Sequence, residues 1–170
     1  IYVTGNLGDS YLGLKALSNK AKFKNKDKLF FVDKYYKPEL PLNLTKHLLK
    51  FANSSIDVSD GLIDDLSKMI NRQNLSFHLF ENKIPVSNKL SNLIKKQRLN
   101  KINLISNGDD YQVLFTADIK KARIIQKASK TTGIKITKIG KIVSGKDRSL
   151  IFDEKGKQIQ AKSKGYIHRF

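Results

Sequence analysis

The sequence predicts a mixed α/β (α+β) fold in which helices pack on a mixed sheet. Segments with helical period and segments of alternating or β-branched residues follow one another along the whole chain. The last two such segments, 150–152 and 158–161, flank the turn Asp153-Glu154-Lys155-Gly156 and resemble a hairpin, which argues against a purely parallel sheet. With 170 residues, 39% of them apolar, the chain is long enough for one domain with a hydrophobic core.

Turn residues separate the expected elements. Segment 1–4 is a strand, residues 5–8 form a tight turn, and Asp9 and Ser10 can cap the helix that follows. A helix over 27–36 ends before Pro38, because the residue before a proline disfavours helical geometry. The later elements are a helical segment at 43–51, a strand at 54–58, a helix after Gly61, strands at 75–80 and 111–116, helices at 88–97 and 118–132 with Gly133 at the end, and strand residues within 134–143.

The formal net charge of +18 is of the kind found in proteins that bind nucleic acid or anionic membranes. However, only five of the 33 basic residues are Arg, which is favoured for base and bidentate phosphate contacts, and the lysines are spread along the chain. We therefore expect anionic small substrates and no nucleic-acid partner. No apolar run reaches about 18 residues, so no membrane partner is expected. The absence of cysteine excludes disulfides and is compatible with a cytoplasmic location.

The strongest chemical signal is Ile56-Asp57-Val58-Ser59-Asp60-Gly61-Leu62, followed by Asp64-Asp65-Leu66. Asp57, at the end of a buried strand, and Asp60, at a helix start, could hold Mg²⁺, which is usually bound by one or two carboxylates plus substrate phosphates. Ser59 could offer its hydroxyl or its N–H to a phosphate, and the first-turn N–H groups favour an anion there. The alternative is that Ser59 or Asp60 merely caps the helix, while the two later aspartates interact with its dipole.

A second motif, Ser106-Asn107-Gly108-Asp109-Asp110-Tyr111, places adjacent carboxylates at a glycine turn before a strand. Adjacent carboxylates repel each other, so they make sense if one faces a ligand or cation. An ordinary polar turn is the alternative.

Two further glycine motifs lie near the ends of the chain. Gly5-Asn6-Leu7-Gly8-Asp9-Ser10 could cradle a phosphate at a helix start, but it lacks the Walker pattern, and a turn capped by Asp9 is the favoured interpretation. In Lys164-Gly165-Tyr166 the tyrosine could stack on an aromatic ligand or could simply be a packed aromatic residue.

Taken together and in this order, these motifs resemble thiamine-monophosphate kinase, a family related to aminoimidazole ribonucleotide synthetase, selenophosphate synthetase and hydrogenase maturation proteins. The resemblance runs through the whole chain. It is carried by residues 1–10, by Tyr35-Tyr36-Lys37-Pro38-Glu39-Leu40-Pro41, by Asp57-Val58-Ser59-Asp60-Gly61-Leu62, by Gly108-Asp109-Asp110-Tyr111 and by Lys164-Gly165-Tyr166.

The resemblance implies that residues 1–170 are the C-terminal ATP- and substrate-binding domain of a kinase with Mg²⁺ as cofactor. Asp57 and Asp60 would bind Mg²⁺, Ser59 would contact ATP, and Asp109 and Tyr166 would contact thiamine monophosphate. The family's N-terminal domain, which carries further magnesium-binding aspartates and forms the homodimer, is absent from this chain. The opening Ile1, without an initiator Met or signal pattern, likewise suggests a strand entered in mid-protein. The chain alone is therefore not expected to catalyse.

Three alternatives stay open at this point. A sister enzyme of the same superfamily would use ATP and magnesium with another acceptor. A basic nucleic-acid-binding module would show salt-dependent binding. A non-catalytic scaffold with a degenerate site is suggested by Asp109, where the family usually has Glu, and by Leu42, where it usually has Arg.

Overall fold

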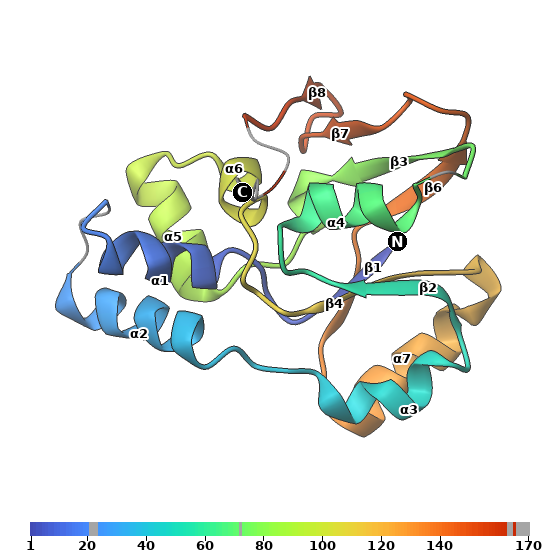
Figure 1. Cartoon of the computed structure of the whole chain (residues 1–170), viewed down its shortest axis with the longest axis horizontal. Helices are drawn as coiled ribbons and strands as arrows, with labels where there is room; N and C mark the ends of the chain where they lie inside the picture. Colours follow the sequence, from blue (N-terminus) through green and yellow to red (C-terminus); the bar gives the residue numbers. More distant parts are fainter. Residues whose placement is uncertain (21–23, 72, 163–164, 166–170) are drawn as a thin grey trace, which may run out of the picture.

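The structure is a computed structural model that describes residues 1–20, 24–71, 73–162 and 165. Within these residues it contains eight strands and seven α-helices (Figure 1). The strands are β1 (Tyr2–Thr4), β2 (Ala52–Asp57), β3 (Leu75–Phe80), β4 (Val113–Ala117), β5 (Ile136–Lys138), β6 (Gly140–Ser144), β7 (Leu150–Phe152) and β8 (Gln158–Ile159). The helices are α1 (Asp9–Leu17), α2 (Asn25–Tyr36), α3 (Thr45–Leu48), α4 (Leu62–Met69), α5 (Asn88–Gln97), α6 (Lys101–Ile105) and α7 (Ala122–Thr132).

The first sheet has the strand order β2-β4-β1-β5, and every neighbouring pair in it is antiparallel. Alternate residues of each strand point to opposite sides of this sheet, and an apolar cluster covers each side. Val3 and Leu114 pack into the main core, whereas Tyr2 and Phe115 stack at 5.2 Å between ring centres on the other face. Since β2 lies at the edge of this sheet, its end is accessible to solvent.

The second sheet has the order β6-β3-β7-β8 and is mixed, since β3 pairs antiparallel with β6 but parallel with β7. The pair β7–β8 is the expected terminal hairpin. The predicted fold class, mixed α/β with helices on a mixed sheet, is confirmed, although the strands divide between two sheets.

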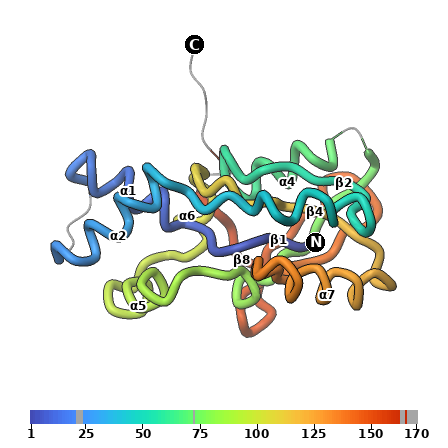
Figure 2. Tube along the Cα trace, turned by 90° about the horizontal axis from the view of Figure 1, so that it is seen from below, coloured from blue at the N-terminus to red at the C-terminus, as the bar shows by residue number. Residues whose placement is uncertain are grey.

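The helices form two groups around these sheets. Helices α1, α2 and α5 lie together at one end of the molecule, away from the strands (Figure 1), and share a small core that includes Leu12, Phe31 and Leu90. Helices α4 and α7 lie on opposite sides of β1 and β4 (Figure 2), and each covers one face of the first sheet through a separate apolar cluster. The turn between β2 and α4 lies at the end of β2 that is nearer to the helices α1, α2 and α5 (Figure 1).

Several predicted boundaries agree with the structure and others do not. The segments 75–80 and 88–97 form β3 and α5 as predicted, and Gly133 ends α7 in the left-handed conformation, with φ of 70°. The helix predicted at 43–51 is only a 3₁₀ turn followed by the four-residue α3. Helix α6 was missed, because a five-residue helix has too few turns to show a period.

Candidate functional site

The turn that joins β2 to α4 contains the first motif. Asp57 is the last residue of β2, and it is exposed, because residues along this edge strand alternate between half-buried and exposed. The expectation that Asp57 ends a buried strand is therefore wrong. Ser59 and Asp60 follow in the turn and are half-buried, and Gly61 precedes the first residue of α4.

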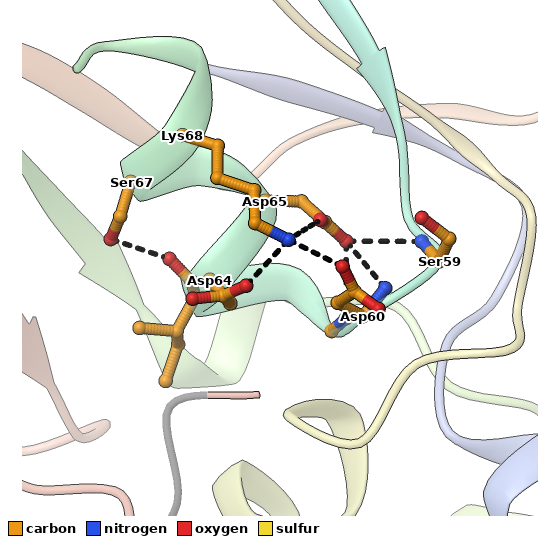
Figure 3. A network of polar contacts seen from close by, with 8 residues as sticks. Ser59, Asp60, Asp64, Asp65, Ser67 and Lys68 are labelled. Atoms are coloured by element: carbon orange, nitrogen blue, oxygen red, sulfur yellow. Dashed lines mark hydrogen bonds and ion pairs between the residues drawn. The ribbon is translucent and has the colours of Figure 1, made fainter. Parts of the chain in front are cut away.

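A carboxylate from inside the helix caps this turn. Asp65 is 1% exposed, and its Oδ2 accepts hydrogen bonds from the N–H groups of Ser59, Asp60 and Gly61, each at 3.0 Å (Figure 3). The N-cap residue is Gly61, which has no side chain to do this, and not the expected Ser59 or Asp60. The expected caps are therefore wrong, and these three N–H groups are not available to a phosphate.

An acidic cluster lies on the first turn of α4. Carboxylate oxygens of Asp60, Asp64 and Asp65 lie within 4.8 Å of one another. Lys68 pairs with all three: with Asp60, with Asp64 at 2.7 Å and with Asp65 at 3.4 Å, and its ammonium group lies between the carboxylates in Figure 3. These carboxylates raise the pKa of Lys68, so the position strongly favours positive charge.

The donor set of this cluster fits Mg²⁺, which prefers carboxylate oxygens and keeps several sites for water and phosphate. Since the backbone occupies Asp65 Oδ2, Asp60 and Asp64 are the carboxylates better suited to bind an ion. Asp57 does not belong to this cluster of the described residues.

The second motif packs directly against the first. The N–H of Asp109 donates to the carbonyl of Ser59 at 2.9 Å, and the N–H of Tyr111 donates to the carbonyl of Val58 at 2.9 Å. Two glycines permit this approach: a Cβ at Gly108 would overlap the carbonyl oxygen of Ser59, and one at Gly61 would overlap the backbone of Ser106. Two motifs about fifty residues apart in the sequence therefore form one surface.

The backbone of this second loop is unusual. Gly108, Asp109 and Tyr111 have φ values of 73°, 60° and 50°, in the left-handed region that non-glycine residues rarely adopt. Such strain concentrates at functional sites, where the surrounding structure imposes it. Burial raises the pKa of the half-buried Asp109 carboxyl, and the negative charge of Asp60 adds to this shift. The pKa of Tyr111 is raised by burial and by the nearby carboxylates of Asp109 and Asp57.

Asp110 has a structural position different from that of its neighbour. It is 4% exposed, and its Oδ2 accepts the N–H of Gly8 at 2.7 Å, just before the first turn of α1. The expectation that Asp9 or Ser10 caps this helix is wrong, because Asp9 is itself buried in the helix and accepts a hydrogen bond from the Ser87 hydroxyl at 2.7 Å. Since Asp110 engages the N–H of Gly8, this group is also not available to cradle a phosphate.

Stability is expected to fall as the pH rises through the titration range of Asp110. Burial raises the pKa of this carboxyl from 3.8 to about 8, so the folded state retains a proton that the unfolded chain has released. Between these pH values the free energy of unfolding should decrease, by at most about 1.4 kcal/mol for each pH unit. Urea unfolding at several pH values should show a flatter profile for Asp110→Asn. The exposed control Asp147→Asn should follow the parent, and an Asp110→Asn profile as steep as the parent's would contradict the assignment.

Of the motif Lys164-Gly165-Tyr166, the structure describes only Gly165, which lies beside the acidic cluster. A Cβ at Gly165 would overlap the side chain of Asp64 and approach the carbonyl of Asp60, so the chain at Gly165 lies against the acidic cluster. Tyr166, the expected substrate contact, lies outside the described residues.

A cavity of about 780 Å³ lies elsewhere, between α4, β3 and the β7–β8 hairpin. Its lining contains Lys146 and Asp147 as charged residues and none of the residues of 57–61 or 106–111. The acidic groups that could support chemistry are therefore on the loop surface and not in this cavity.

Sequence reasoning did not assign Asp65 or Tyr111 to the site. One signal was available for Asp65, because a glycine at the N-cap leaves helix N–H groups unsatisfied and an acidic side chain in the first turn can reach back to them. No local signal identified Tyr111, whose surroundings depend on the contact between the two loops.

Comparisons with known proteins identify relatives of this chain by sequence and by fold. The chain is 35% identical over 170 residues to thiamine-monophosphate kinase from Buchnera aphidicola subsp. Schizaphis graminum. This alignment covers 99% of this chain and 52% of that protein. The solved structure of AaThiL complexed with AMPPCP and TMP superposes with a TM-score of 0.73 at 28% identity, over 98% of this chain and 50% of that one. The chain corresponds to the carboxy-terminal half of proteins in the thiamine-monophosphate kinase family.

The chain spans about half the length of the curated family members that it matches. No protein-family model matches it. Escherichia coli HypE, a hydrogenase maturation protein, shares the fold with a TM-score of 0.71 over 95% of this chain and 49% of its own, and at 14% identity this likeness concerns the fold alone. Among the described residues, none of the helices combines the length and the apolar character required to span a membrane.

Proposed function

We propose that the full-length protein containing this chain catalyses the ATP- and magnesium-dependent phosphorylation of thiamine monophosphate to thiamine diphosphate. In this proposal the chain contributes only part of the active site. A further N-terminal domain would supply additional magnesium-binding aspartates and would form a homodimer. We propose that the enzyme acts in the cytoplasm, as the family resemblance implies.

The observation that carries the proposal is the convergence of the motifs on one surface. The turn with Ser59 and Asp60 is hydrogen-bonded to the loop with Asp109, and Gly165 packs against the same turn. Catalysis of phosphoryl transfer depends mainly on positioning the reactants and on neutralising charge. Two loops that carry carboxylates and are held together by hydrogen bonds can serve both needs. The relative complexed with AMPPCP and TMP supports the choice of substrates.

Each residue then has a specific role. Asp57 and Asp60 would hold Mg²⁺; Asp64 lies with Asp60 in the acidic cluster, whereas Asp57 lies at the end of β2, outside that cluster. Mg²⁺, when bound, neutralises charge on the transferred phosphoryl group. Ser59 contacts ATP through its hydroxyl, since its N–H and its carbonyl are both engaged within the protein.

Asp109 and Tyr166 contact thiamine monophosphate. The acceptor is a phosphate that already carries negative charge, so this chain does not have to provide a general base. The hydrogen bond from the Asp109 N–H to the Ser59 carbonyl holds the two loops side by side, which supports an acceptor site next to the site for ATP.

The direct test is a transfer assay with the full-length protein, ATP labelled on the γ-phosphate, and Mg²⁺. We expect label to appear in thiamine diphosphate, to depend on Mg²⁺, and to be absent when thiamine or AMP replaces thiamine monophosphate. If the protein hydrolyses ATP or labels a different acceptor while leaving thiamine monophosphate unchanged, a sister enzyme of the superfamily is the better description.

A further inference from the structure

Asp65 is a buried carboxylate to which the proposed reaction assigns no direct contact. One of its oxygens accepts three backbone hydrogen bonds, from Ser59, Asp60 and Gly61, each at 3.0 Å. The other oxygen lies 3.4 Å from Lys68 Nζ. The side chain is 1% exposed, so its charge is satisfied by the turn before its own helix and by Lys68.

The three N–H groups would otherwise form an anion-binding site. Consecutive backbone N–H groups at a helix start attract phosphates and carboxylates. Asp65 fills this position from within the protein, and a phosphate there would meet a buried negative charge. A nucleotide phosphate is therefore excluded from the backbone N–H groups of the turn, which leaves it the Ser59 hydroxyl and a metal ion that Asp60 would hold.

Asp65 also fixes where those two side chains lie. The N-cap residue Gly61 has φ of 124° and has no side chain that could hold the turn. Lys68 pairs with Asp65 and also with Asp60 and Asp64 (Figure 3). Asp65 therefore orders both the backbone of the turn and the ammonium group that pairs with the acidic cluster. Other support for the turn comes from the hydrogen bond between the Ser59 carbonyl and the N–H of Asp109.

We propose that Asp65 is a positioning residue of the nucleotide site: it holds the Ser59 hydroxyl and the Asp60 carboxylate in place and excludes phosphate from the N–H groups of the turn. This inference rests on the proposed function, because it assumes that a metal-bound nucleotide is the ligand of this surface.

The test uses the full-length protein with Asp65→Asn and Asp65→Ala, and it measures binding of AMPPCP with Mg²⁺ by calorimetry together with kcat and KM for ATP. Asn keeps one acceptor oxygen but loses the charge, so we expect affinity about tenfold weaker, as for loss of a charged hydrogen-bond partner. Ala should lose more. Formate, a carboxylate small enough for the vacated space, should restore part of the binding and of kcat in Asp65→Ala and should not affect the parent.

The control is Ser76→Ala. Ser76 is also 1% exposed, and its hydroxyl holds another turn by donating to the Gly145 carbonyl at 2.6 Å and accepting the N–H of Arg148 at 3.0 Å. We expect Ser76→Ala to lower thermal stability while leaving nucleotide affinity and kcat unchanged.

Three outcomes would overturn the proposal. The first is parent-like binding and turnover in both Asp65 variants. The second is an equal loss of affinity in Ser76→Ala, with no response to formate in Asp65→Ala. The third is a parent that binds no nucleotide, which would also remove the proposed function. A parent that binds AMPPCP without phosphorylating thiamine monophosphate, with Asp65→Asn weakening that binding, supports the role of Asp65 while rejecting the proposed acceptor.

Discussion

Asp60→Asn and Asp57→Asn are each expected to lower the turnover of the full-length protein by at least about 100-fold, because each removes a negative charge that would hold the metal at the transferred phosphate. Folding should survive, since Asp57 is exposed and Asp60 is only half-buried. The measurement is the steady-state rate of thiamine diphosphate formation as a function of Mg²⁺ concentration. We expect the Mg²⁺ requirement of both variants to rise.

A matched control is Asp27→Asn. Asp27 pairs with Lys89 at 3.8 Å on the helical end of the molecule, so this substitution also removes one carboxylate charge and one ion pair. Half-exposed ion pairs with a separation this long contribute little to stability, and the control should retain the parental rate. Rates near the parental value for both Asp57→Asn and Asp60→Asn would rule out the proposed metal ligands.

Gly108→Ala is expected to lower the free energy of unfolding by about 3 to 5 kcal/mol, which combines left-handed strain with overpacking. Gly108 has φ of 73°, and an added Cβ would overlap the carbonyl oxygen of Ser59, a backbone atom that cannot rotate away. The two loops would have to separate. Denaturant unfolding measures the stability, and the transfer assay should show a loss of activity where the variant remains folded.

Gly133→Ala separates the two causes. Gly133 has nearly the same φ, 70°, but no atom lies within 4 Å of the position that a Cβ would take. This control should lose only the conformational part, about 1 to 2 kcal/mol, and should keep its activity. Equal destabilisation by the two substitutions would mean that the contact between the loops contributes nothing beyond the backbone conformation.

Much of the fold could be predicted because it is local. Alternating Phe77 and Leu79 identified β3, and the left-handed glycine at position 133 marked the end of α7. The motifs around Asp57 and Asp109 were also visible in the sequence, together with the family that they resemble. The division of the strands into two sheets was not visible, because pairing such as that of β2 with β4 joins residues about sixty positions apart.

The candidate site shows the same limit at the level of single residues. Local rules assign a cap to the nearest polar side chain, and they favoured Ser59 or Asp60 for α4 and Asp9 for α1. In the structure Asp65 caps the start of α4 from inside that helix. Asp110 caps the start of α1 from a segment about a hundred residues away in the sequence. The competing caps were chemically equivalent in the sequence, and packing decided between them.

The sequence by itself determined which residues could carry charge to this site, the periodic segments that became its strands and helices, and the glycines that allow tight turns. The tertiary structure alone decided which carboxylates face solvent and which accept hydrogen bonds from backbone N–H groups. The physical reason is that burial and hydrogen bonding of Asp65 and Asp110 arise from contacts with other parts of the chain. Neither the spacing of residues nor their secondary-structure propensity predicts where those contacts form.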